Sequence, residues 1–328
     1  MANKLKTRVT EILGVEYPLI MGTMQGLSNA ELVAAAANAG AFACIASTMF
    51  KTSQELREEI RKTKSLTDKP FGVNINLFPM IRPPNPYEYI DAIIEEGVTI
   101  IETAGRSPEE LVDHIKKGNA KLVHKVARLR DARTAERVGA DIVEVVGAEA
   151  GGHPSREQIG SLVLIPQVVD AVQIPVIAGG GIADARGFVA VLALGAEGVL
   201  IGTRFLATQE CEIPPILKDR LIEAQSTDSM FTLRSLGDPL RALRNQLTTE
   251  IEEMEQKGAT FEDLLPVISG EKSREAMARG EADNTILACG QVVGMIHDIP
   301  TVKELIDSII NGAIAIQERL GSAVSGKG

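Results

Sequence analysis

The stretch 174–205 reads IPVIAGGGIADARGFVAVLALGAEGVLIGTRF and contains two short apolar runs, each followed by glycine. The first run, IPVIAGGG (174–181), leads into DARGFVAVLALG, a segment of helical period that begins at Asp184 and ends at Gly195. Aspartate is a common helix N-cap, and glycine commonly follows the last helical turn. The second run, GVLIGTRF, covers 198–205. A strand, a helix and a second strand in this order predict a βαβ unit with parallel strands.

The same alternation runs through the first two-thirds of the chain. Six more runs have the length of strands, and each is mostly apolar, as expected when both faces of a parallel sheet are buried. Together with the two runs above, they give eight candidate strands. The six further runs are YPLIMGTM (17–24), AFACIAST (41–48), KPFGVNINLF (69–78), VTIIETAG (98–105), AKLVHKVA (120–127) and ADIVEVVG (140–147).

Eight strand–helix units predict an α/β fold with a closed (β/α)8 barrel, the TIM barrel. An open, doubly wound sheet is the alternative, although such sheets usually have fewer strands. The dinucleotide fingerprint of that alternative is incomplete here. GGGIAD (179–184) matches G-x-G-x-x but has Asp184 in place of the last glycine, and it comes far along the chain.

Strand patterns end near residue 211, and helical patterns follow. PLRALRNQLTTEIEEMEQK (239–257) is predicted to form an amphipathic helix, and NTILACGQVVGMIHD (284–298) a more apolar one. TVKELIDSIINGAIAIQERL (301–320) has an apolar stripe that suits the last helix of the barrel.

We therefore expect two parts. Residues 1–224 form the barrel, which a last helix within 300–328 completes. Residues 225–299 form a helical insertion over the barrel mouth, where it would serve as a lid or a substrate subdomain.

Composition narrows the classes of function. The net charge of −10, without a long basic run, argues against nucleic acid as a partner. The three cysteines have no metal-ligand spacing, so no metal site is predicted. The N-terminus has no signal-peptide pattern, and the apolar stretches are too short to span a membrane. These features predict a cytoplasmic protein with a small-molecule substrate.

Two glycine groups mark the ends of the last two predicted strands. The seventh strand ends in Gly179-Gly180-Gly181, and the eighth in Gly202-Thr203-Arg204. In TIM barrels, the loops after strands 7 and 8 commonly bind a phosphate. Glycine lets backbone N–H groups approach phosphate oxygens closely. Either glycine group alone would indicate only a tight turn, but glycine at both strand ends predicts a phosphate site.

Polar residues interrupt two of the apolar strands. Asn74 and Asn76 lie in the third strand, where an amide could bind the edge of a pyrimidine ring. Lys125 lies in the fifth strand, where a buried ammonium requires an anion. The side chain of His124 points to the opposite face from Lys125, so we interpret His124 as structural.

The sixth strand leads into GAEAGGHPSREQIG (147–160). The small residues Ala150, Gly151 and Gly152 would let a flat ring lie against the backbone. His153 follows directly and could serve as an acid, a base or a substrate anchor at neutral pH.

At this point the chain resembles the FMN-dependent barrel family that contains nitronate monooxygenases (2-nitropropane dioxygenases), flavoprotein enoyl-ACP reductases and a bacterial NADH:quinone reductase. The resemblance covers nearly the whole chain. Its most specific segments are IMGTMQGLSNAELVAAAANAG (20–40), FGVNINL (71–77), GAEAGGH (147–153), PVIAGGGIADARG (175–187) and LGAEGVLIGTRFLAT (194–208).

The resemblance implies FMN as cofactor and a role for each matching residue. Lys125 would lie near the carbonyl edge of the flavin and stabilise its reduced, anionic form, and His153 would act on the substrate. The implied FMN contacts are the backbone at Gly22, Thr23 and Met24, the pyrimidine partner Asn74, the ring neighbours Ala150 and Gly151, and the phosphate ligands Gly180, Gly181, Gly202 and Thr203.

The subfamily is less clear from the sequence. GAEAGGH is similar to the nitronate monooxygenases, in which the histidine is the catalytic base. The loop PSREQIGSLVLIP (154–166), RPPNPYEY (82–89) and LRSLGDPLRALRNQ (233–246) are more similar to the quinone reductase, and the enoyl reductase pattern fits less well around 149–160. We therefore expect a reductase that uses NAD(P)H and a quinone or a related acceptor.

Several alternatives stay open at this point. They are a monooxygenase that oxidises alkyl nitronates with O2, an enoyl-thioester reductase that acts on activated alkenes, and a scaffold that binds a phosphorylated ligand without catalysis. The sequence also leaves open whether the chain forms a homodimer.

Overall fold

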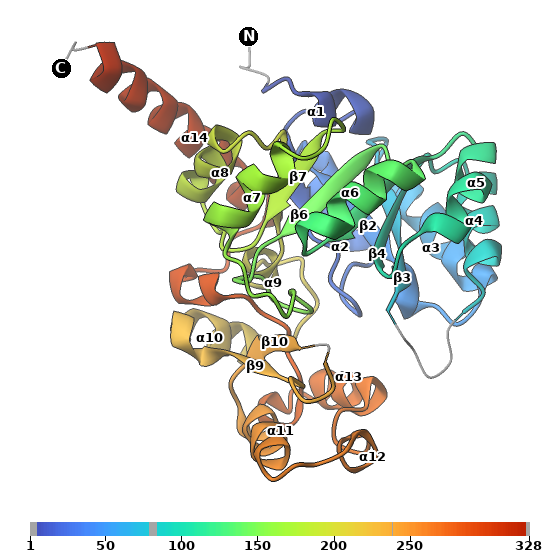
Figure 1. The fold of residues 1–328 in the computed structure, drawn as a ribbon, viewed down its shortest axis with the longest axis vertical. Helices are drawn as coiled ribbons and strands as arrows, with labels where there is room; N and C mark the ends of the chain where they lie inside the picture. Colours follow the sequence, from blue (N-terminus) through green and yellow to red (C-terminus); the bar gives the residue numbers. More distant parts are fainter. Residues whose placement is uncertain (1–4, 79–83, 238, 326–328) are drawn as a thin grey trace.

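The computed structural model describes residues 5–78, 84–237 and 239–325. Eight parallel strands form a closed barrel in sequence order, and β1 pairs with both β2 and β8. Each strand lies inside its predicted range, so the predicted TIM barrel is confirmed (Figure 1). The strands are β1 (Leu19–Met21), β2 (Phe42–Ala46), β3 (Gly72–Leu77), β4 (Ile100–Gly105), β5 (Lys121–Val126), β6 (Ile142–Val146), β7 (Val176–Gly179) and β8 (Gly198–Ile201).

Helices separate the strands and cover the outside of the barrel. Asp184 begins α8 as predicted, because its side chain accepts hydrogen bonds from the N–H groups of Arg186 (2.9 Å) and Gly187 (3.4 Å). The helices of this part are α1 (Arg8–Leu13), α2 (Ala30–Asn38), α3 (Ser53–Leu66), α4 (Pro86–Glu95), α5 (Glu109–Lys117), α6 (Leu129–Val138), α7 (Ser161–Val169), α8 (Ala185–Ala193), α9 (Thr203–Leu206) and α14 (Val302–Ser325).

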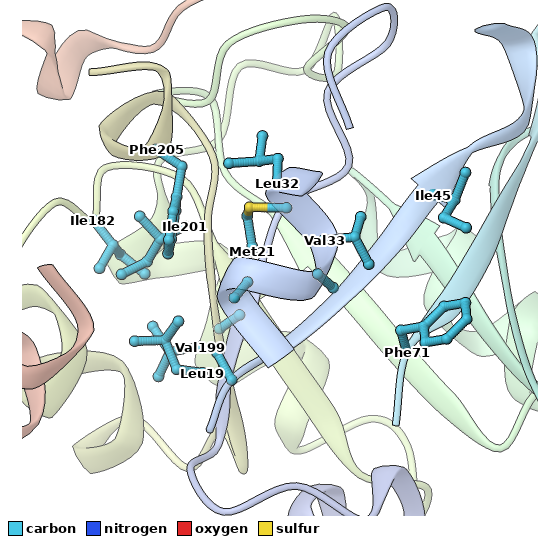
Figure 2. Close-up of a cluster of buried hydrophobic side chains, with 14 of the residues drawn as sticks. Leu19, Met21, Leu32, Val33, Ile45, Phe71, Ile182, Val199, Ile201 and Phe205 are labelled. Atoms are coloured by element: carbon cyan, nitrogen blue, oxygen red, sulfur yellow. The ribbon is translucent and has the colours of Figure 1, made fainter. Parts of the chain in front are cut away.

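The main core lies between the strands and these helices. Figure 2 shows outward-facing strand residues such as Met21 and Ile45 near Leu32 and Val33 of α2. The long helix α14 packs against α8 and ends at the C-terminus, away from the barrel (Figure 1). Part of α14 thereby covers the barrel helices α8 and α2. Within the described residues, no helix has the length and apolar character needed to cross a membrane.

The inside of the barrel contains two layers of side chains. The lower layer is apolar, and Val9 and Leu13 of α1 close it from below. The upper layer lies two residues further along each strand, because alternate side chains point inward. Its half on β3–β6 is polar and contains Asn74, Glu102, Lys125 and Glu144, whereas the other half contains Gly22, Ala46, Gly179 and Gly202.

The sequence predicted a helical segment after the barrel strands, but this segment is only partly helical. It contains an antiparallel pair of strands as well as helices and has a small core of its own around Leu233, Ile251 and Leu264. In Figure 1 it lies to one side of the barrel. Its elements are α10 (Pro215–Glu223), β9 (Ser229–Thr232), β10 (Leu240–Leu243), α11 (Gln246–Gln256), α12 (Phe261–Leu264) and α13 (Gly270–Ala278), with 3-10 turns at Ser226–Asp228, Ala282–Asn284 and Gln291–Met295.

Two predicted helices were therefore wrong in part. Residues 240–243 of the segment 239–257 form β10, and the helix starts only after Asn245, whose side chain accepts a hydrogen bond from the N–H of Thr248 (2.8 Å). The predicted helix at 284–298 contains only one 3-10 turn. Its backbone carbonyls bond to neighbouring segments instead: Leu287 accepts from the N–H of Leu243 (2.9 Å) and Cys289 from the hydroxyl of Ser229 (2.9 Å).

Candidate active site

A cavity of about 1030 Å³ lies at the C-terminal ends of the barrel strands. The loops after the strands form most of its wall, and the insertion contributes apolar side chains such as Leu240, Ile286 and Leu287. The insertion thus borders the mouth of the barrel. All of the residues predicted for the site line this cavity: Gly22, Thr23, Met24, Asn74, Lys125, Ala150, Gly151, His153, Gly180, Gly181, Gly202 and Thr203.

Lys125 lies on the floor of the cavity and has two carboxylate partners. Its Nζ is 2.8 Å from Glu144 Oε1 and 3.2 Å from Glu102 Oε1. Both glutamates are buried in the upper layer, on the strands that flank β5. The anion that the sequence required for Lys125 is therefore provided at least in part by the protein itself.

Sequence analysis missed these two glutamates. Their signal was present, because IIETAG and DIVEVVG each place one acid inside an otherwise apolar strand. A buried carboxylate is costly unless it is paired, so each of these acids implied a cation nearby. Because the strands of these two acids flank the strand of Lys125, the three residues together indicate a cluster of buried charges.

Asn74 is part of the same layer. Its Nδ2 donates to Glu102 Oε1 (2.5 Å), and its Oδ1 accepts from Gln25 Nε2 (3.1 Å). The amide is buried and lines the cavity, but both of its ends already bind protein groups. Asn76 instead accepts from the N–H of Phe78 (3.0 Å) and shapes the loop after β3.

The glycine groups after β7 and β8 leave backbone donors at the cavity wall. Gly180 and Gly181 have φ of 94° and 75°, a region that favours glycine. In the described residues, the N–H groups of Gly180, Gly181 and Gly202 have no hydrogen-bond acceptor. Beside Gly202, no atom lies within 4 Å of where a Cβ would stand. Such a concave, donor-lined wall can hold an anion.

The loop after β1 offers fewer donors than the sequence suggested. The N–H of Gly22 bonds to the carbonyl of Ile201 (2.8 Å), and the N–H of Met24 bonds to Ser28 Oγ (2.9 Å). By contrast, Thr23 Oγ1 is buried and has no hydrogen-bond partner among the described residues. An unpaired buried hydroxyl is costly, and Thr23 lines the cavity, so a ligand bound there could provide the missing partner.

The loop after β6 is held from two sides. Glu149 accepts hydrogen bonds from the N–H (3.0 Å) and the hydroxyl (2.9 Å) of Ser161, at the start of α7. Gly152 forms a β-bridge with Arg241 of β10, and a Cβ on Gly151 would lie 2.6 Å from the carbonyl carbon of Cys289. Glycine at 151 is thus required by the close approach of the insertion.

Arg241 fixes this loop further. Its guanidinium is buried, and it donates to the carbonyls of Ala148 (3.1 Å) and Ser229 (3.0 Å). It also lies over the ring of Phe231 at 3.9 Å from the centroid. Burial lowers the pKa of Arg241 from its usual value. Sequence analysis did not find this residue, because nothing in PLRALRNQ shows that one arginine turns inward.

The two histidines of interest occupy different environments. His153 lies at the exposed rim of the cavity, with its ring 4.9 Å from that of Phe78. His124 is buried, 2.8 Å from the hydroxyl of Thr103, and burial lowers its pKa to about 4. His124 does not line the cavity, in agreement with its interpretation as structural.

These features fit the FMN that the resemblance implies. Thr23 lines the cavity and has a buried hydroxyl without a hydrogen-bond partner among the described residues, space is open beside Gly202, and the glycine loops provide donors for one phosphate. The described residues contain no group of three or more His, Cys, Asp or Glu side chains that could hold a metal ion.

Fold and cavity together define a TIM-barrel enzyme with a donor-lined cavity wall at the C-terminal face of the strands. The model of the nitronate monooxygenase family matches residues 6–84 and 79–312. The chain belongs to this family, and it is an oxidoreductase.

Individual relatives carry different names. The chain is 33% identical to a (3aS,4S,5R,7aS)-5-hydroxy-7a-methyl-1-oxo-octahydro-1H-indene-4-carboxyl-CoA dehydrogenase of Rhodococcus jostii, covering 97% of this chain and 98% of that one. It is 30% identical to a probable nitronate monooxygenase of Staphylococcus saprophyticus, with 96% and 100% covered. The structure of FabK from Thermotoga maritima superposes with a TM-score of 0.88 at 35% identity, with 97% and 99% covered.

Proposed function

We propose that this protein is an FMN-dependent reductase that takes hydride from NAD(P)H and transfers it to an electron-poor acceptor, either a quinone or an activated alkene. The observation that carries the proposal is the large cavity at the barrel mouth, which has glycine loops suited to a phosphate and apolar residues of the insertion in its wall. About 300–1000 Å³ suffices for one ligand, so a cavity of 1030 Å³ has room for a cofactor and part of a substrate.

The residues of the chain have distinct tasks in this proposal. FMN, when bound, supplies reversible hydride chemistry. Gly180, Gly181 and Gly202 hold its phosphate, and Thr23 donates or accepts a hydrogen bond. Lys125 places a positive charge at the floor of the site, and His153 orients the acceptor or supplies a proton at the rim.

The relatives bear on the acceptor. The relative from Rhodococcus jostii is named as a carboxyl-CoA dehydrogenase, which supports an acyl thioester as the compound that carries the alkene. The quinone preference rests on the sequence pattern of 82–89, 154–166 and 233–246, of which residues 82, 83 and 238 lie outside the described residues. We therefore keep quinone and enoyl thioester as two acceptors of the same proposed reductase.

One experiment separates the candidate functions. The chromophore released by denaturing the purified protein is identified first, and we expect FMN. The flavin is then mixed anaerobically with NADH, NADPH or an alkyl nitronate, and its absorbance is followed. Bleaching by a nicotinamide, followed by reoxidation with a quinone or an enoyl thioester, supports the proposal. If neither NADH nor NADPH lowers the flavin absorbance, the proposal is contradicted.

The second candidate is a nitronate monooxygenase, which the family name and the position of His153 after the double glycine favour. In this case His153 serves as the base for the nitro compound. Bleaching by the nitronate but by neither nicotinamide, with O2 consumed on reoxidation, identifies this function.

A further inference from the structure

The polar half of the upper barrel layer contains more negative charge than positive charge. Glu102, Lys125 and Glu144 lie on three consecutive strands, and the single ammonium is within 3.2 Å of both carboxylates. The exposed fraction of the side chain is 18% for Lys125, 2% for Glu102 and 0% for Glu144. With all three groups ionised, two acids outnumber one base in a place that water hardly reaches.

Glu144 is satisfied least. Apart from the ion pair with Lys125, neither of its carboxylate oxygens has a hydrogen-bond partner among the described residues. Glu102 has one further donor, the amide of Asn74. Below these side chains lies the apolar layer with Val123 and Ile142, which offers no donor. A buried carboxylate with so little compensation costs stability that an apolar residue would retain.

The position of this cluster beside the cavity suggests a function that offsets the stability lost by burying the two carboxylates. Lys125 lines the cavity, and the two carboxylates lie behind it, out of contact with the cavity. A ligand in the cavity therefore meets the ammonium first, while both carboxylates reduce the positive field that it experiences. In such a poorly hydrated place, neighbouring charges act strongly on one another.

We propose that Glu102 and Glu144 are positioning residues that hold Lys125 at the cofactor site and offset its charge, so that the reduced cofactor is stabilised less than Lys125 alone would stabilise it. This inference rests on the proposed FMN-dependent function. Its consequence is a lower midpoint potential, which favours transfer of hydride onward to a weak acceptor over retention on the cofactor.

The test is the midpoint potential of the FMN-loaded protein, measured by anaerobic titration against a reference dye. Lys125→Met is expected to lower the potential, and Glu144→Gln and Glu102→Gln are expected to raise it. Each glutamine variant leaves one ammonium beside one carboxylate. Each glutamine variant removes one carboxylate charge that offsets Lys125. The affinity for reduced relative to oxidised FMN should therefore rise about tenfold or more, the size of one charge-assisted contact.

The controls separate this role from a merely structural one. Glu197→Gln removes one ion-paired carboxylate beside Arg8, outside the cavity, and should leave the potential unchanged. Glu144→Asp keeps the charge and should return the potential toward the wild-type value. If Glu144→Gln does not fold, Glu102→Gln carries the test, because Asn74 and Lys125 still surround that position.

The outcomes are distinct. Potentials that stay unchanged or fall in folded, FMN-loaded Glu102→Gln and Glu144→Gln variants overturn the inference and leave the proposed function standing. A protein that binds no FMN overturns both. Potentials that shift as expected in an enzyme that accepts no nicotinamide support the inference while the proposed reductase activity fails.

Discussion

Lys125 was selected from the sequence as a buried lysine that needs an anion, but the two glutamates beside it were not predicted. A lysine inside a barrel strand needs an anion, and the sequence pointed to a reduced flavin as that anion. The structure instead places Glu102 and Glu144 against the ammonium. Lys125 is therefore paired before any ligand arrives, and its effect on the cofactor is the balance of three charges.

The role of His153 can be tested by substitution. Because its side chain lies at the cavity rim, His153→Asn should retain FMN binding. In a monooxygenase the variant should lose about 10²–10⁴ in the rate with neutral nitroalkanes, from which a general base must remove a proton. In a reductase only the reoxidation step by the acceptor should slow. Stopped-flow measurement of the two half-reactions distinguishes these results.

A matched control for this test is His297→Asn, since His297 is exposed and does not line the cavity. If His153→Asn abolishes FMN binding while turnover of the reconstituted protein is normal, His153 is structural and the catalytic assignment is wrong.

His124 should make stability depend on pH. Burial lowers its pKa from 6.5 to about 4, so the unfolded chain binds more protons between these values. This contribution is fully present above pH 6.5 and is lost as the pH falls through 6.5 toward 4. Between pH 8 and pH 5 the wild-type protein should lose about 2 kcal/mol through this residue.

The measurement is urea unfolding at pH 8 and pH 5 for the wild type and for His124→Gln. The glutamine can retain a hydrogen bond to Thr103 but does not titrate. The variant should therefore lose about 2 kcal/mol less than the wild type over this range. Equal losses in both proteins would show that His124 does not control acid stability.

At the scale of elements, the loops after β7 and β8 separate two uses of glycine. At Gly180, φ is 94° and a Cβ would lie 2.8 Å from the N–H nitrogen of Gly147, so an alanine is strained by the protein itself. At Gly202, φ is −105° and no atom lies within 4 Å of a Cβ, so an alanine would occupy only cavity space.

These geometries predict opposite results. Gly180→Ala should destabilise the FMN-free protein by about 1–3 kcal/mol. Gly202→Ala should leave that stability within about 0.5 kcal/mol while weakening FMN binding. Urea unfolding of the FMN-free variants and titration with FMN provide both numbers. Unchanged FMN affinity in Gly202→Ala would place the phosphate elsewhere.

For the whole molecule, closure of the barrel wall depends on contact between distant parts of the chain. Gly312 of α14 lies against α8, and a Cβ there would be 2.6 Å from the Cβ of Ala185. Gly312→Ala should therefore push the helices apart and destabilise the protein by about 1–3 kcal/mol. Thermal or urea unfolding measures this loss.

Gly321 provides the control on the same helix, because no atom lies within 4 Å of its Cβ position. Gly321→Ala should be neutral or stabilising by up to about 1 kcal/mol, since alanine is the better helix former. If both substitutions have the same effect, α14 does not dock on α8 as described.

Much of the barrel could be predicted from the sequence, because local patterns determine it. A strand buried on both faces is an apolar run, and helix ends carry capping residues such as Asp184, so all eight strands appear in the right places. The candidate site residues were also identifiable, since the ends of parallel strands meet at one face of a barrel. Their gathering in one cavity follows from that topology.

What the sequence did not reveal depends on contacts between segments far apart in the chain. The run 284–298 has apolar residues at helical spacing, yet the carbonyls of Leu287 and Cys289 bond to β10 and β9, and the run forms only a 3-10 turn at Gln291–Met295. The inward turn of Arg241 and the pairing of Glu102 and Glu144 with Lys125 likewise exist only once four strands and the insertion come together. Local periodicity carries no information about such partners, so only the tertiary structure decides how these polar groups are satisfied.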